Sequence, residues 1–147
     1  MFAKVIDGIV ALSSVALDKE WIKVTSFPSN RKKRDKWTLS GSVVSAPETT
    51  TAEKIAAIRA AIDLHIETVA KSAGDFGFDS VLSAVSYVGG NPENINVIYG
   101  TAIFNYRQAC YDKARDLLTA WKSGGKELTP EQAVKNMPLW TKYKPEL

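Results

Sequence analysis

His65 and Cys110 are the residues whose types most readily do chemistry, and the chain has one histidine and one cysteine. His65 stands between Asp63 and Glu67, but alternate positions do not face each other on a helix. Cys110 would need a neighbouring base or positive charge to become a nucleophile, and Arg107 on the same expected helix points mostly elsewhere. These counts also exclude an internal disulfide and most metal sites or catalytic triads. We therefore interpret both as packing residues.

Other patterns that resemble catalytic or cofactor sites are incomplete. Gly74–Gly77 and Gly89-Gly90 lack the Lys-Ser/Thr or the third glycine that phosphate-binding loops require, and they predict helix ends. Asp112 and Asp116 are one helical turn apart, but basic neighbours make them resemble surface charge patterning rather than an acid–base pair. The sequence therefore predicts a protein that is not an enzyme, with no cofactor, no metal and no small-molecule substrate.

One cluster of basic residues lies in the first third of the chain. Residues 1–48 hold eight Lys/Arg and five Asp/Glu, a net charge of +3, whereas the remaining residues are balanced. The excess comes from Arg31, Lys32, Lys33, Arg34 and Lys36. The cluster could contact nucleic acid, or it could be a solvated loop between two strands. A loop is favoured, and nucleic acid is an unlikely partner, because one short run is much smaller than a basic face.

The predicted secondary-structure elements divide the chain into two parts. Apolar runs at 2–6 and 9–12 flank Asp7-Gly8, which is a strong signal for a hairpin with a type I′ turn. Two more β-prone stretches follow at 21–27 and 37–44, the latter interrupted by Gly41. Residues 1–48 are therefore predicted to form a small, mostly antiparallel β region.

The rest of the chain has helical periodicity. Apolar residues at three- and four-residue spacings predict a helix from about 50 to 73, a short one at 81–88 and a long one at 94–122. Thr129 and Pro130 open a last short helix as a capping box with proline in the first turn. The fold class is thus α+β, with an antiparallel helical hairpin or bundle at 49–138 and an irregular tail at 139–147. The predicted helical core consists of Ile58, Ile62, Val69, Tyr99, Ile103, Tyr106, Leu117 and Trp121.

Five aromatic residues lie outside the helical stripes, in short strands or irregular chain. They are Trp21, Phe27, Trp37, Trp140 and Tyr143. Aromatic side chains of this kind often anchor protein interfaces, so we predict that they contact a partner. An edge strand of the opening hairpin could also pair with a partner's sheet. In the alternative, the tail folds back over the chain's own β region and buries all five.

Several stretches of the sequence follow a known pattern. The opening residues 2–10 are similar to the hairpin that begins many small tail and tail-fibre-assembly proteins of bacteriophages. The segments 66–70, 77–81, 83–87, 106–111, 128–131 and 137–138 resemble a helical domain at the C-terminal ends of phage tail proteins. Where that pattern often has tryptophan before its arginine, this chain has Tyr106. Residues 13–50 match nothing in the pattern.

The resemblance implies a structural component of a phage tail, at a fibre attachment or baseplate site, and it brings no catalytic residues. The implied partners are other tail proteins or copies of the chain. The implied location is the tail of the virion, after assembly in the host cytoplasm. Two alternatives stay open: a cytoplasmic chaperone for tail-fibre assembly, and a nucleic-acid-binding accessory protein that uses the basic cluster. The short apolar runs and the N-terminus predict neither a membrane span nor a signal peptide.

Overall fold

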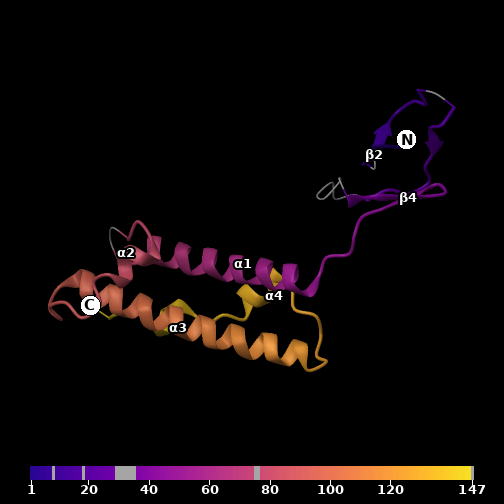
Figure 1. Ribbon diagram of the computed structural model, residues 1–147. Helices are drawn as coiled ribbons and strands as arrows, with labels where there is room; N and C mark the ends of the chain where they lie inside the picture. The colour runs from indigo at the N-terminus through magenta and orange to yellow at the C-terminus, as the bar shows by residue number, and fades with distance from the viewer. Residues whose placement is uncertain (8, 18, 29–35, 75–76, 147) are drawn as a thin grey trace. The chain divides into compact units, whose positions relative to one another are not determined.

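The computed structural model describes residues 1–146 except 8, 18, 29–35 and 75–76. The chain forms two compact units, Met1–Thr50 and Thr51–Leu147. Strands make up the regular structure described in the first unit and α-helices that in the second, so the α+β fold class is confirmed (Figure 1). Each unit is described separately below.

The chain opens with the predicted hairpin. Strands β1 (Phe2–Ile6) and β2 (Ile9–Ser13) are antiparallel, with Phe2 opposite Ser13 and Ile6 opposite Ile9. Asp7 in the turn has a φ of +50°. Positive φ at this position is what a two-residue type I′ turn requires, and Asp is among the residues that tolerate it. The local sequence at this turn therefore determines the register of the hairpin.

The other strands are shorter than the apolar runs suggested. β3 (Ile22–Lys23) pairs with the free side of β1, which gives a sheet in the order β2-β1-β3 among the described residues. The stretch predicted as one strand interrupted by Gly41 is a second hairpin, made of β4 (Thr38–Ser40) and β5 (Val43–Ser45). Gly41 has a φ of +55° and lies in the turn, so the glycine reverses the chain instead of interrupting a strand. The core of this unit is formed by Ala3, Val10, Val24, Trp37 and Val44.

Two long antiparallel helices, α1 (Thr51–Lys71) and α3 (Ile95–Lys122), form the body of the second unit (Figure 1). The shorter helix α2 (Val81–Val85) precedes α3 and packs against both. Asn94 caps α3, and its side chain accepts a hydrogen bond from the Asn96 N–H at 2.8 Å. Helix α4 (Pro130–Lys135) packs on α1 and has the predicted capping box between Thr129 and Gln132. A 3₁₀ helix, η2 (Trp140–Lys142), follows.

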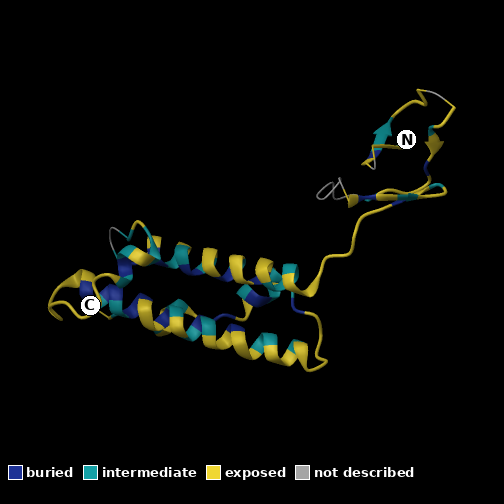
Figure 2. Cartoon of the chain, viewed as in Figure 1, coloured by how far each residue is buried: buried dark blue, intermediate teal, exposed yellow. Residues whose placement is uncertain are grey.

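The core of the helical unit lies along the seam between α1 and α3, where buried residues recur along both helices among exposed ones (Figure 2). Most of the predicted core is buried, namely Ile58, Ile62, Tyr99, Ile103 and Tyr106. Val69, Leu117 and Trp121 are only partly buried but pack against the same core. The spacing of apolar residues therefore located the buried faces correctly, because a packed helix repeats every 3.6 residues.

Helix α2 approaches α3 at a glycine. A Cβ atom built on Gly100 would lie 2.4 Å from the carbonyl oxygen of Ala84. Real side chains do not approach a backbone oxygen that closely, so this position on α3 accepts α2 only because it lacks a side chain. The close contact places α2 at one end of the seam between the long helices.

Candidate functional site

Tyr106 is a junction between three segments of the helical unit. Its hydroxyl oxygen lies 2.8 Å from Nε2 of His65 on α1 and donates a hydrogen bond of 3.2 Å to the carbonyl oxygen of Pro138. A carbonyl can only accept, so the single hydroxyl proton goes to Pro138 and His65 donates through Nε2–H. Burial raises the pKa of Tyr106, which keeps the hydroxyl protonated. His65 thus has a structural partner, as the sequence analysis expected.

The two aromatic residues of the C-terminal tail pack on this same tyrosine. The ring of Trp140 lies 5.4 Å from that of Tyr106 at 71°, and the ring of Tyr143 lies 5.5 Å away at 65°. Edge-to-face pairs of this kind are favourable beyond the area that they bury. Both side chains were candidates for contact with a partner, but the structure places them half-buried against the chain's own helices.

The N-terminal candidates differ in exposure. Trp37 is 3% exposed in the core of its unit, beside Val10 and Val44, so it is a core residue and not a contact residue. Trp21 is half-buried, and Phe27 is 40% exposed. Of the five aromatic candidates, Phe27 therefore presents the most exposed side chain to a partner.

The basic cluster lies largely outside the described residues. Arg31, Lys32, Lys33 and Arg34 fall there, and Lys36 is exposed at the start of the segment that leads to β4. The prediction that this cluster is a loop between two strands therefore lies largely outside the described residues.

A groove runs along the α1–α3 seam on the side of α1 away from α4. Its larger hollow is about 460 Å³ and is lined by residues of α1 and α3. The apolar part of the lining consists of Ile55, Ile58, Ile62, Ala114 and Leu118. Of these, Ile58, Ile62 and Ala114 are buried in the core of the unit. Helix α4 contacts α1 through another face, around Ala61 and His65, so the groove remains open while α4 and the tail pack elsewhere.

Arginines from both helices line the same hollow. They are Arg59 on α1 and Arg107 and Arg115 on α3. The guanidinium carbon of Arg107 lies 5.3 Å from the centre of the Tyr111 ring, which is a cation–π geometry. The hydroxyl of Tyr111 donates a hydrogen bond of 2.6 Å to Asp63 on α1. Burial and this bond to Asp63 raise the pKa of Tyr111, so the link between the helices stays protonated and intact.

A smaller hollow of about 140 Å³ continues the groove toward α2. It shares Arg107 and Tyr111 with the larger hollow and adds Asp63, Ile66 and Glu67 of α1 and Val81 and Leu82 of α2. We refer to the two hollows together as the α1–α3 groove. Leu82 is 74% exposed at its margin.

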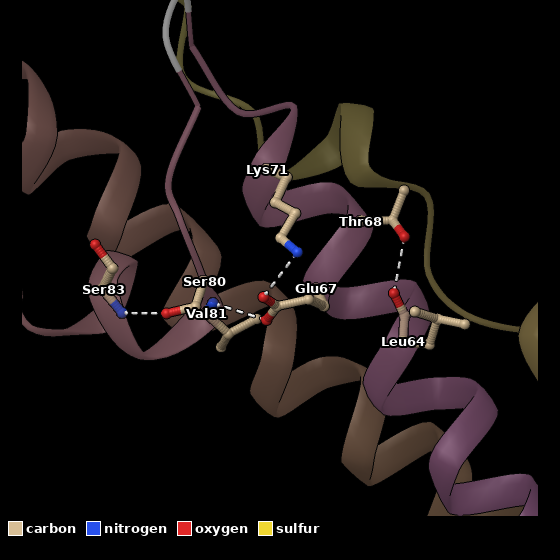
Figure 3. A network of polar contacts seen from close by, with 7 residues as sticks. All are labelled: Leu64, Glu67, Thr68, Lys71, Ser80, Val81 and Ser83. Atoms are coloured by element: carbon tan, nitrogen blue, oxygen red, sulfur yellow. Dashed lines mark hydrogen bonds and ion pairs between the residues drawn. The ribbon is translucent and has the colours of Figure 1, made fainter.

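Polar contacts hold the α2 end of the groove in place (Figure 3). Glu67 on α1 accepts a hydrogen bond of 2.9 Å from the backbone N–H of Val81, and Lys71 lies 3.5 Å from its other carboxylate oxygen. The Ser80 hydroxyl accepts a hydrogen bond of 3.1 Å from the Ser83 N–H, which caps α2. These bonds satisfy amide groups that would otherwise lack partners at the helix start. These contacts therefore attach the start of α2 to α1.

Sequence reasoning missed this groove. Arg107, Tyr111 and Arg115 recur every four residues, which places them on one face of α3, but the sequence analysis did not consider them together. That face became a groove only because α1 lies beside it with Ile55 and Arg59. The available signal was the regular spacing of arginines next to an apolar stripe.

The other described residues offer little support for a metal site, a membrane span or a reactive thiol. No group of three or more His, Cys, Asp or Glu among them could hold a metal ion, and none of the described helices is long and apolar enough to cross a membrane. Cys110 is fully buried, and burial raises the pKa of its thiol.

Comparisons of the chain with protein-family models, curated proteins and solved structures found no match.

Proposed function

We propose that this chain is a non-enzymatic structural component of a phage tail, at a fibre attachment or baseplate site, and acts through protein–protein contacts. The α1–α3 groove is the observation that carries the contact role. Its two hollows are lined by residues of the helical core together with charged side chains of both signs, on a unit whose core is packed along the same seam. The assignment to a phage tail comes from the resemblance to tail proteins, which covers residues 62–138 and, more loosely, residues 1–12.

The two units have separate roles in this proposal. The helical unit supplies a rigid body, because α4 and the tail aromatics brace the α1–α3 pair. In the N-terminal unit, strand β2 is at the edge of the sheet β2-β1-β3, and edge strands can pair with a strand of another chain. Phe27 adds an exposed aromatic side chain in the same unit. Each unit can therefore contact a different neighbour in an assembly.

Mass spectrometry of purified phage particles tests the proposal. The full chain should be found in particles and in isolated tails, at a constant ratio to a known tail protein. Its presence in infected cells but absence from particles would instead favour the alternative, a cytoplasmic chaperone of tail-fibre assembly. Its absence from both particles and tail-assembly intermediates would contradict both functions.

A further inference from the structure

We propose that a hollow at the start of α3 binds a free α-amino acid with an apolar side chain. The hollow measures about 710 Å³, which exceeds either hollow of the α1–α3 groove and falls within the size range of small-molecule sites. This inference goes beyond the protein contacts of the proposed function, and it assigns a bound ligand rather than a substrate.

Three segments of the helical unit surround this hollow. They are the end of α1 with the residues that follow it, the first turns of α3, and the C-terminal tail, which lies beside the start of α3 (Figure 1). Ala73 and Tyr99 are buried, whereas the rest of the described lining is half-buried or exposed. Phe78, Ile95 and Pro145 provide apolar surface, and Ile95 is 48% exposed. The walls are therefore open surface and not part of the chain's own core.

Tyr99 brings a hydroxyl without a partner to the hollow. The residue is 9% exposed, and its hydroxyl makes no hydrogen bond to the described residues, unlike the hydroxyls of Tyr106 and Tyr111. A buried tyrosine hydroxyl usually has a hydrogen-bond partner. Trp37 Nε1 is the one fully enclosed side-chain donor or acceptor that lacks a partner in the described part of the chain. The Tyr99 hydroxyl is therefore accessible from the hollow, where a ligand oxygen would complete its hydrogen bonding.

Charges of both signs line the hollow without neutralising each other. Lys144 and Glu146 are exposed, and they form no ion pair with each other or with other described residues. The 28-residue helix α3 begins at the same hollow, and the N-terminus of a helix carries a partial positive charge. The Asn94 side chain and carbonyl already accept hydrogen bonds from the N–H groups of residues 96–98, so α3 contributes its field rather than free donors. A ligand with one negative and one positive group suits this arrangement.

A free α-amino acid supplies each group that the hollow lacks. Its carboxylate would accept a hydrogen bond from the Tyr99 hydroxyl and pair with Lys144. Its ammonium group would pair with Glu146, and its apolar side chain would contact Phe78 and Ile95. Hydrogen bonds to a charged group are the strongest of these contacts. A simple anion would leave Glu146 opposing it, and a peptide end carries one of the two charges only.

NMR titration of the isotope-labelled full-length protein with leucine tests the proposal. Amide signals of Ile95, Asn96 and Tyr99 should shift, with a dissociation constant of about 1 mM or below. N-Acetyl-leucine lacks the ammonium and leucinamide lacks the carboxylate, so each should bind about two- to five-fold less tightly, as expected for an exposed ion pair. Glycine lacks the apolar side chain and should bind about ten-fold less tightly.

Two charge substitutions assign the ends of the ligand. Lys144→Gln should weaken the binding of leucine and N-acetyl-leucine but not of leucinamide. Glu146→Gln should weaken the binding of leucine and leucinamide but not of N-acetyl-leucine. The matched control is Lys142→Gln, which changes an exposed lysine two residues away that does not line the hollow and should leave all three affinities unaltered.

Tyr99→Phe separates ligand binding from a structural role. The affinity for leucine should fall about ten-fold, as expected for a lost hydrogen bond to a charged group. The melting temperature should stay the same, because the hydroxyl has no partner among the described residues. The proposal is overturned if leucine shifts no signals, if N-acetyl-leucine or leucinamide binds as tightly as leucine, or if Tyr99→Phe keeps the full affinity.

Discussion

Nε2 of His65 and the hydroxyl oxygen of Tyr106 lie 2.8 Å apart and join the middle of α1 to the middle of α3. The same hydroxyl contacts the carbonyl oxygen of Pro138, just before the C-terminal tail. One side chain thus connects both long helices with the segment that follows α4. The histidine that might have suggested catalysis is part of the support for the fold.

The Tyr106 hydroxyl should contribute measurably to stability. In Tyr106→Phe, the N–H of His65 and the carbonyl of Pro138 lose their partner in a partly buried site, which should cost about 1–3 kcal/mol of unfolding free energy. Urea unfolding monitored by circular dichroism measures this loss. The matched control is Tyr111→Phe, which removes an exposed hydrogen bond to Asp63 and should cost about 1 kcal/mol or less. Equal effects of the two substitutions would contradict the role assigned to Tyr106.

The C-terminal tail should be part of the helical fold. Trp140→Ala removes an aromatic side chain packed on Tyr106 and should lower the unfolding free energy by about 2 kcal/mol or more. Leu139→Ala changes the adjacent residue, which is 66% exposed, and should have an effect within about 0.5 kcal/mol. Thermal unfolding of both variants measures the difference. A chain that ends after Pro138 and keeps the full melting temperature would show instead that the tail is available for contacts with a partner.

A charged substitution at Ile103 tests whether this residue lies at the centre of the core. Ile103 is fully buried on α3, so Ile103→Asp places an unpaired carboxylate inside the helical unit. That change costs several kcal/mol, comparable to the whole stability of a small domain, and should unfold the unit. Leu64→Asp is the control, since Leu64 is on α1 but 67% exposed. Unchanged helicity and melting in Ile103→Asp would contradict the core described above.

We expect no tight binding of duplex DNA at physiological salt. The basic cluster at 31–36 can neutralise about five phosphates, which gives weak affinity that falls steeply with salt concentration. Fluorescence anisotropy with a labelled duplex at about 50 and 150 mM salt measures both properties. Sub-micromolar affinity at the higher salt, lost when residues 31–34 become serine, would instead support the nucleic-acid-binding alternative.

The parts of the fold that the sequence predicted are those determined by local chemistry. The Asp7-Gly8 turn, the Thr129 capping box and the stripe from Ile58 to Tyr106 each depend on neighbouring residues or on helical periodicity. Trp37 and Trp140 could not be placed in this way, because their burial depends on contacts with residues distant in sequence. The α1–α3 groove could not be predicted for the same reason, because its arginines come from two helices that are distant in sequence.

The reactivity of the Cys110 thiol can report how often the helical unit opens. Its thiol is fully buried between α1 and α3, and it is the sole cysteine of the sequence. Since burial also raises its pKa, little reactive thiolate forms in the folded state. A thiol reagent can therefore react only when the helices separate, and the labelling rate measures how often this opening occurs. A partner that bridges α1 and α3 would slow that labelling, so binding at the groove could be followed kinetically without introducing a foreign group.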